Sequence, residues 1–451
     1  MAIDNNGFSL GGLFNQGQRV LKLAGMTVAV AGSYAQNRLK QVLFSAPPDE
    51  TGLADLYRAI GEEVAQTLGE LKGAAMKVGQ IASQTRGLLP PPITEALETL
   101  QKAAPPLPFK VIRKQIRSEL KTAPEQLFAW IDTRPFAAAS IGQVHRARTH
   151  DGREVIVKVQ YPGVARSCDS DLAQLKLLLQ VGRLINLKGE VLDQLFEEIR
   201  TRIHEELDYH KEAENIRCFR RFHENDAAVV IPAVVDELST RRVLTLEYEP
   251  GDHLSEVKPP RYSQAVINQL GRRLFQTMVK QLLLLQAVHV DPHPGNFAFR
   301  PDGALVIYDF GCIKKLQPTI VRAYRDAIAA FLEGDFAALD QAMIDLGVRI
   351  EDGPPVAADY YALWRDILIR PFLAGVPFDF SVSTLHEDVV RQAPGILKRL
   401  DSFQPAADIV YINRMLGGHY WNLLQLGVKV SFFDDFQQLL ESEPMSYPPA
   451  T

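Results

Sequence analysis

Two short polar strings in the second half of the chain constrain its fold more than any other feature. The first, D-P-H-P-G-N, begins at Asp291 and ends at Asn296, and the second is the D-F-G string that begins at Asp309, 13 positions beyond Asn296. Proline and glycine shape the first string so that its Asp and its Asn converge, and the second string closes an apolar run that is typical of a strand. Such a set of oxygen-bearing side chains indicates a site that handles metal ions and phosphates.

The two strings supply the groups that phosphoryl transfer needs on a protein-kinase-like scaffold. Asp291 is expected to accept a proton from a hydroxyl group or to position water. Asn296 and Asp309 are predicted to bind Mg²⁺, which bridges phosphate oxygens and offsets their charge. His293 lies inside the first string, where a structural hydrogen bond is expected rather than catalysis.

A lysine on a strand is the next requirement, because the phosphates need a positive charge beside them. Residues 154–160 read E-V-I-V-K-V-Q, which predicts a strand with Lys158 between apolar residues. Asp151-Gly152 predicts a tight turn before it, and residues 142–148 predict the preceding strand. Most lysines in valine-rich strands are only edge charges, so the hairpin is what favours a phosphate-binding role for Lys158.

Alanine occupies the segment where protein kinases have a glycine-rich loop. Alanine allows close approach of the backbone to phosphates but adopts positive φ less freely than glycine, so this loop should be stiffer. The residues expected to contact the nucleotide here are Ala137, Ala138, Ala139, Ser140, Ile141, Gly142 and Gln143.

Taken together, A-A-A-S-I-G-Q-V-H, D-P-H-P-G-N and D-F-G resemble the UbiB/AarF family of atypical kinases, which is linked to ubiquinone (coenzyme Q) biosynthesis. Two further marks of that family are present, K-x-G-Q at Lys77 to Gln80 and E-x-D at Glu206 to Asp208. The motifs stand in the family's order within residues 50–430. The resemblance implies an α+β, bilobal protein-kinase-like fold with a helical N-terminal extension packed over the active site and an all-helical C-terminal region.

The resemblance also implies roles for the K-x-G-Q and E-x-D strings. Read alone, Lys77 and Gln80 would be a solvated face of a helix. In the family the extension folds over the site, so Lys77 is expected to point inward to Glu206 and Asp208. A lysine there occupies the space of a protein substrate, which implies autoinhibition or a restriction to small or no phosphoryl acceptors.

A long helix is predicted over residues 192–217 from its apolar stripe. Kinases use one helix glutamate to orient the strand lysine. Glu212 is assigned to Lys158 because Glu206 belongs to the E-x-D string, and Glu206 is the alternative. Farther along, T-L-E-Y resembles the hinge between lobes, where Glu247 and Tyr248 would meet the adenine of ATP or ADP.

Proline clusters at 90–92 and 105–108 divide the chain. The predicted parts are a leader over 1–48, a helical K-x-G-Q extension over 50–104, an N-lobe over 109–250 and a C-lobe with C-terminal helices over 251–451.

Composition excludes several classes of protein. With 49 Lys and Arg against 54 Asp and Glu, the net charge of −5 gives no basic footprint for nucleic acid. The three cysteines (168, 218 and 312) are too far apart for a disulfide framework, which favours a reducing, cytoplasmic location. No apolar run reaches the ~18 residues that span a bilayer. Residues 23–35, flanked by basic residues, either lie on the inner face of a membrane or pack on the protein itself.

A long activation segment is absent after Gly311, because a helical pattern resumes at residue 320. Protein kinases dock peptides on that segment, so a protein substrate is disfavoured. Three functions stay open: an ATP-dependent phosphotransferase or ATPase that acts in quinone-lipid metabolism, with a lipid or prenylated quinone precursor as partner; a nucleotide-binding scaffold; and a true protein kinase. The sequence leaves the oligomeric state open, a homodimer included.

Overall fold

The computed structural model describes residues 106–139, 141–165 and 204–442, with the positions 169, 172–173, 176, 193, 196–197 and 200–201 between them. These residues form two compact units. We call them the sheet unit, which contains the described residues up to Lys211 together with Val234–Tyr248, and the helical unit, which contains Glu212–Ala233 and the described residues from Glu249 onward. The predicted leader, the K-x-G-Q extension with Lys77 and Gln80, and Ser140 lie outside the described residues.

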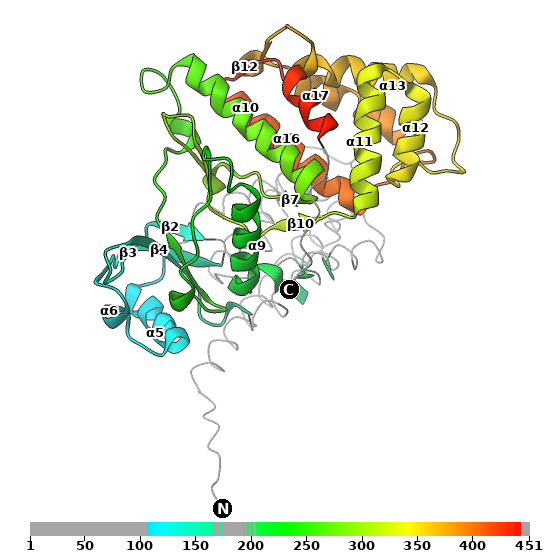
Figure 1. Cartoon of the computed structure of the whole chain (residues 1–451). Coiled ribbons are helices and arrows are strands. Elements are labelled where there is room, and N and C mark those ends of the chain that lie inside the picture. The colour runs from blue at the N-terminus through cyan, green and yellow to red at the C-terminus, as the bar shows by residue number, and fades with distance from the viewer. Residues whose placement is uncertain are drawn as a thin grey trace, which may run out of the picture. The chain divides into compact units, whose positions relative to one another are not determined.

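An antiparallel five-stranded sheet forms the centre of the sheet unit (Figure 1). The predicted hairpin is confirmed: its strands end at a turn where Gly152 has φ +93° and the Thr149 N–H donates to the Arg153 carbonyl at 3.0 Å. The strand order is β1-β3-β4-β6, with β2 also paired to β3. The strands are β1 (Trp130–Ile131), β2 (Ala137–Ala139), β3 (Gly142–Arg148), β4 (Glu154–Gln160) and β6 (Val243–Glu247).

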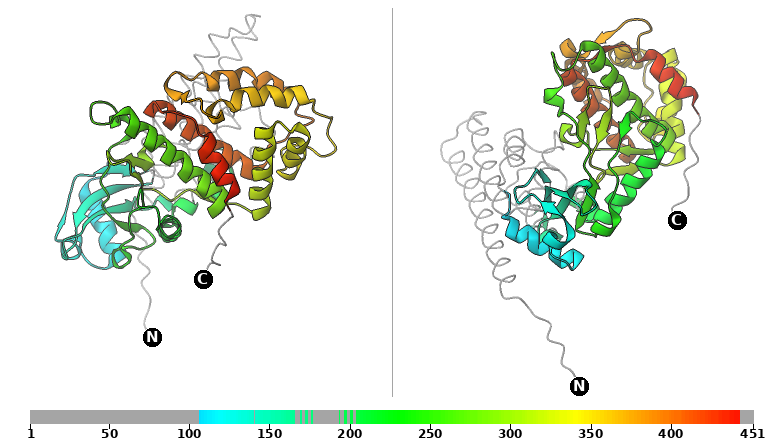
Figure 2. Two further views of the ribbon diagram at one scale, coloured as in Figure 1. Left: turned by 45° about the horizontal axis from the view of Figure 1, so that its top comes forward. Right: turned by 60° about the vertical axis from the view of Figure 1, so that its left-hand side comes forward.

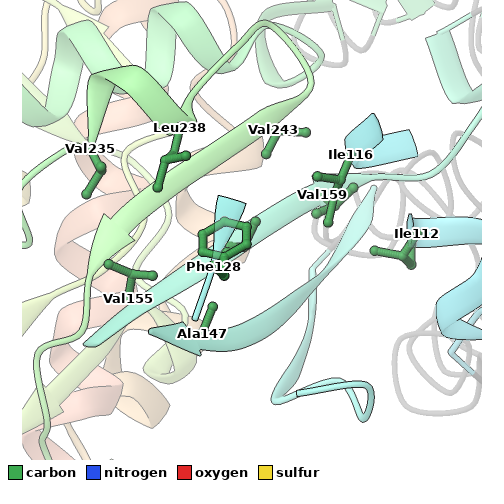
Figure 3. Packing of buried hydrophobic residues seen from close by; sticks show 10 residues of the cluster. Ile112, Ile116, Phe128, Ala147, Val155, Val159, Val235, Leu238 and Val243 are labelled. Carbon is green, nitrogen blue, oxygen red and sulfur yellow. The ribbon is translucent and has the colours of Figure 1, made fainter. Parts of the chain in front are cut away.

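Helix α5 (Phe109–Leu120) packs on β4 and closes the core of this unit. Ile112 and Ile116, one helical turn apart, are fully buried, and so are Val155 and Val159 on one face of β4. Figure 3 shows these side chains gathered around Phe128, which follows α6 (Pro124–Leu127). Apolar side chains one turn apart on α5 pack against apolar side chains on one face of β4. This core holds β4, and with it the backbone of Lys158, in place.

The predicted single helix over residues 192–217 is wrong, because the chain breaks at Leu207–Asp208 and α9 (Tyr209–Phe222) starts afresh. The Asp208 carboxylate accepts the His210 N–H at 3.1 Å, and the Asp208 carbonyl accepts the Lys211 N–H. An aspartate at this place caps a new helix, since it satisfies backbone N–H groups that have no partner within the helix. The apolar spacing continues through Leu207 and so hides the break.

Helices dominate the helical unit (Figures 1 and 2), in which α10 and α16 run side by side and α11 lies beside α12. The helices are α10 (Gln264–Lys280), continued by a π-helical turn (Gln281–Leu285), α11 (Pro318–Glu333), α12 (Phe336–Asp345), α13 (Ala358–Leu368), α14 (Leu385–Arg391), α15 (Ala393–Leu397), α16 (Ala407–Leu426) and α17 (Phe433–Glu441).

Two small sheets carry the polar strings, and apart from β5 their strands lie between α10 and α11 in the chain. Strands β7 (Ala287–His289) and β10 (Ile313–Lys315) pair, and β5 (Val229–Val230), β9 (Leu305–Ile307) and β8 (Phe297–Phe299) form the other sheet. The expectation of an all-helical C-terminal region holds except for β11 (Phe378–Asp379) and β12 (Lys429–Val430). Gly427, at φ +70°, ends α16 and turns the chain so that this short pair forms.

Among the described residues, we find no helix with the length and apolar character that crossing a membrane requires.

A buried histidine gives the helical unit a sensitivity to acid. His223 is 4% exposed, and burial lowers its pKa to about 4, although Asp226 opposes the shift. The pKa of histidine in an unfolded chain is about 6.5, so protons bind the unfolded state more tightly and the free energy of unfolding falls as the pH drops from ~6.5 toward 4.

We expect His223→Leu to remove about 2 kcal/mol of the stability difference between pH 7.5 and pH 5. Urea unfolding at the two pH values measures it. His150→Leu is the control, because His150 is exposed. Equal pH dependence in the wild type and the His223 variant would contradict the prediction.

Candidate active site

Two antiparallel pairings bring the D-P-H-P-G-N and D-F-G strings together. In the first, Ile313 of β10 pairs with His289 of β7, and the Val290 N–H donates to the Cys312 carbonyl at 3.1 Å. Asp291 therefore leaves β7 at the end where the D-F-G string enters β10.

The second pairing places the asparagine of the loop beside the D-F-G string. Phe297 of β8 pairs with Ile307 of β9, and the Tyr308 N–H donates to the Asn296 carbonyl at 2.9 Å. Asn296 and Asp309 consequently sit at the same end of the β8–β9 hairpin. Strands β7, β8 and β9 are buried, whereas β10 is half-buried to exposed. The two registers thus bring together three predicted site residues from positions up to 18 apart in sequence.

Hydrogen bonds within the loop set its shape. The His293 ring Nδ1 accepts the Gly295 N–H at 3.1 Å, so the predicted structural role of His293 is confirmed. The Asn296 amide nitrogen donates to the Asp291 carbonyl at 3.1 Å. Because the nitrogen is engaged, the amide oxygen of Asn296 is the atom that can bind a metal ion.

The D-F-G string is anchored on both sides. The Asp309 carboxylate accepts the Gly311 N–H at 2.9 Å, and the His289 ring Nε2 is hydrogen-bonded to the Asp309 carbonyl. Phe310 is fully buried, with its ring 5.1 Å from that of Phe219 on α9 and 5.7 Å from that of His289. These contacts fix the backbone of Asp309 and leave its side chain half-buried at the surface of the site.

Sequence reasoning missed two of these anchors. His289 stands two residues before Asp291, the place that kinases give to the histidine of H-R-D, so the string H-V-D was an available signal. Asn215 on α9 donates its amide to the Phe310 carbonyl at 2.9 Å. No local pattern reveals Asn215, because its partner is 95 residues away.

The donor atoms fit Mg²⁺. Mg²⁺ prefers hard oxygen ligands and is held by one or two protein groups plus phosphates and water. Asp309 and Asn296 supply a carboxylate and an amide oxygen, both half-buried. Within the described part of the chain, no group of three or more His, Cys, Asp and Glu side chains could hold a metal.

The sheet unit places Lys158 in the middle of its sheet. Lys158 pairs with Val144 on β3 and with Leu244 on β6, and its Nζ lies 5.3 Å from the centroid of the Tyr209 ring. An interior strand with a packed core beneath it holds the lysine backbone in one position. The side chain therefore starts from a fixed point, as a phosphate-binding lysine requires.

Ala137–Ala139 form a strand rather than the expected loop. They pair with β3 in the register Ala137 to Val144 and Ala139 to Gly142, so one edge of this short strand is hydrogen-bonded to β3. Alanine suits this strand, since it does not need positive φ there. The pairing agrees with the predicted stiffness.

Gly142 and Gln143, at the start of β3, are both tightly enclosed. A Cβ on Gly142 would lie 2.2 Å from the Val159 carbonyl oxygen, so only glycine fits. The buried side chain of Gln143 bonds the backbone N–H of Leu107 at 2.9 Å. A nucleotide contact from Gln143 would therefore involve its backbone.

The hinge string begins within β6 and ends at the boundary of the sheet unit. Glu247 is the last residue of β6, and the Tyr248 N–H donates to the Glu154 carbonyl at 2.9 Å. The Arg146 guanidinium lies 4.3 Å from the centroid of the Tyr248 ring. These contacts fix the direction in which the chain leaves the sheet, while contact with adenine stays a prediction.

The three acidic residues of the E-x-D region differ in environment. Glu212 is 3% exposed, whereas Glu206 is half-buried. Asp208 caps α9 and lies 3.5 Å from Arg241. A buried carboxylate needs a charged or hydrogen-bonding partner, which suits Glu212 to the role of lysine partner better than Glu206. The assignment of Glu212 to Lys158, with Glu206 and Asp208 as partners of Lys77, stays a prediction.

Comparison with known proteins agrees with this geometry. The family model of the ABC1 atypical kinase-like domain matches residues 99–343, more than half of the chain. The chain belongs to the ABC1 atypical kinase family. The kinase-like α+β fold and the resemblance to UbiB proteins are thereby confirmed.

Relatives extend the match over most of the chain. Atypical kinase coq-8, mitochondrial, of Caenorhabditis elegans is 30% identical over 395 residues, which are 86% of this chain and 52% of the worm protein. Atypical kinase COQ8B, mitochondrial, of Rattus norvegicus is 29% identical over 424 residues, covering 93% of this chain and 79% of the rat protein. The chain thus spans about half the length of the worm relative.

A solved structure of similar fold is the Rv3197–erythromycin complex from Mycobacterium tuberculosis. It matches with a TM-score of 0.63 at 28% identity, covering 86% of this chain and 98% of that one.

Proposed function

We propose that this ABC1 family member binds ATP with Mg²⁺ and hydrolyses the γ-phosphate or transfers it to a small acceptor. The convergence of Asp291, Asn296 and Asp309 through two strand registers carries this proposal. Three oxygen-bearing side chains held at one place by buried backbone are the groups that phosphoryl transfer requires.

Each residue has a proposed task. When bound, Mg²⁺ neutralises charge on the phosphates, and Asn296 and Asp309 would hold it. Lys158 pairs with phosphate oxygens and is oriented by Glu212. Asp291 accepts the proton of a hydroxyl or orients water. Ala137–Ala139 and the backbone of Gly142 lie along the phosphates, and the chain at Glu247 and Tyr248 meets the adenine.

The short connection after the D-F-G string favours a small acceptor. Ile313 already pairs with His289, only two residues after Gly311, and α11 begins at Pro318. Protein kinases dock peptides on the long segment at this place, so a protein substrate is the least favoured reading. The names of the COQ8 relatives and the UbiB motifs support ubiquinone or another isoprenoid lipid as the pathway, with peripheral attachment to a membrane.

ATP turnover with defined additives tests this proposal. We would measure phosphate release and nucleotide binding with Mg²⁺, with and without anionic liposomes and a phenolic mimic of a quinone precursor, and search the mimic for added phosphate by mass spectrometry. Stimulated phosphate release without a phosphorylated product would establish an ATPase. A phosphorylated mimic would establish a small-molecule kinase.

A nucleotide-binding scaffold is the second candidate, favoured by the pairing of Ala137–Ala139 with β3. A paired strand changes its backbone conformation less readily than a glycine-rich loop does, so it would follow the γ-phosphate less well during transfer. Nucleotide binding without turnover under every condition of the same assay would select the scaffold and reject the enzyme.

A further inference from the structure

Helix α16 packs directly against the loop that carries Asp291. The Asn422 amide nitrogen donates to the Pro292 carbonyl at 2.9 Å, and Asn422 is 2% exposed. One turn earlier, a Cβ on Gly418 would lie 2.0 Å from the Pro292 Cγ. The residue that follows Asp291 therefore rests on the bare backbone of α16 and is held there by a buried hydrogen bond.

A buried histidine stands beside this hydrogen bond. His419 is 4% exposed, and its Nδ1 lies 3.4 Å from the Asn422 amide nitrogen. Burial lowers the pKa of His419 to about 3, with further lowering by His289, so the ring is neutral near pH 7. Its ring also meets the ring of Phe297 edge to face at 5.2 Å. Because the His419 ring is neutral and packs on β8, it places no positive charge beside the Asn422 amide.

The first turns of α16 contact the strand that follows the D-F-G string. The Asp408 carboxylate pairs with Lys314 at 2.7 Å, and the Lys314 Nζ lies 5.4 Å from the centroid of the Tyr411 ring. Lys314 lies on β10, five residues after Asp309. A single helix of 20 residues thus contacts both the loop of Asp291 and the strand that follows Asp309.

We propose that Asn422 and Gly418 are positioning residues, through which α16 holds the Pro292 side of the loop so that Asp291 and Asn296 keep their places relative to Asp309. Neither residue touches substrate in this proposal. The predicted effect on turnover rests on the proposed function, whereas the predicted effect on loop order rests on the contacts alone.

Two neighbouring glycines provide a matched test. A Cβ added to Gly417 would have nothing within 4 Å, whereas one added to Gly418 would meet Pro292. Both lie inside α16, so alanine raises the helix propensity of each by a similar amount. The difference between the effects of Gly418→Ala and Gly417→Ala therefore reports the displacement of the loop alone. Asn422→Leu removes the amide donor and keeps the number and branching of the side-chain heavy atoms.

Deuterium exchange reads the loop without requiring activity. The Gly295 and Asn296 N–H groups are both bonded to His293, so they report the order of the loop. We expect exchange in residues 291–297 to be about tenfold faster in Gly418→Ala and Asn422→Leu, and unchanged in Gly417→Ala. We also expect kcat for ATP to fall about tenfold or more. The Kd for nucleotide measured without Mg²⁺ should stay within about twofold, because in the proposed function the loop carries a proton acceptor and a metal ligand, and the direct nucleotide contacts lie elsewhere.

The two readouts separate the two proposals. Loop exchange in Gly418→Ala and Asn422→Leu that matches Gly417→Ala would overturn the positioning role, whatever the turnover. An inactive wild type would overturn the proposed enzyme, and exchange would still decide the role of α16. Thermal unfolding checks each variant. If Gly418→Ala does not fold, Asn422→Leu against Gly417→Ala makes the same comparison.

Discussion

Replacing Asp309 with asparagine is expected to lower Mg²⁺-dependent ATP turnover by about 100-fold or more while the fold persists. Asparagine keeps the oxygen that accepts the Gly311 N–H, so the D-F-G turn stays intact. The substitution removes the negative charge that would hold Mg²⁺. Loss of one such electrostatic interaction typically lowers kcat ~10²–10³-fold. Phosphate release at saturating ATP measures the effect.

Asp302→Asn is the matched control. Asp302 accepts the Ala304 N–H at 3.0 Å in the turn between β8 and β9, which is the same local bond seven residues earlier. Its side chain is exposed and lies at the opposite end of the β8–β9 hairpin from Asn296, so turnover should not change. Wild-type turnover in Asp309→Asn would remove Asp309 from the metal site.

Replacing Gly142 with alanine is expected to lower the free energy of unfolding by about 1–3 kcal/mol and to weaken nucleotide binding about tenfold or more. The added Cβ would overlap the Val159 carbonyl, so β3 must move away from β4 beside Lys158. Displacement of the hairpin changes the place from which Lys158 reaches the phosphates. Urea unfolding and titration with ADP measure the two effects.

Gly152→Ala separates backbone strain from the overlap. Gly152 lies in the same hairpin with φ +93°, and nothing lies within 4 Å of an added Cβ. Strain of about 1 kcal/mol is expected there, with nucleotide affinity unchanged. Equal ADP affinities for the two variants would show that the close approach of β3 and β4 does not position Lys158.

Features encoded by neighbouring residues could be predicted from sequence. The β3–β4 hairpin follows from alternating apolar residues and an Asp-Gly turn, and the loop that ends at Asn296 follows from its own prolines and glycine. The predicted structural role of His293 was also local, since its partner is Gly295.

Features that depend on distant partners could not be predicted. Gly417 and Gly418 are equivalent in sequence, yet only Gly418 meets Pro292, and nothing near either of them reveals it. The break before α9 was hidden for a different reason. Asp208 belongs to the E-x-D string, which indicates a functional role, and the apolar stripe through Leu207 continues a helical pattern. A capping role and a site role use the same residue type.

The bond between Asn422 and the Pro292 carbonyl spans 130 positions of the chain. During synthesis, the D-P-H-P-G-N loop leaves the ribosome long before the helix on which it rests. A nascent chain that has passed the D-F-G string therefore carries every predicted metal ligand but lacks the support of α16. Under the proposed function, a chain that stops before residue 422 should therefore turn over ATP more slowly than the full chain.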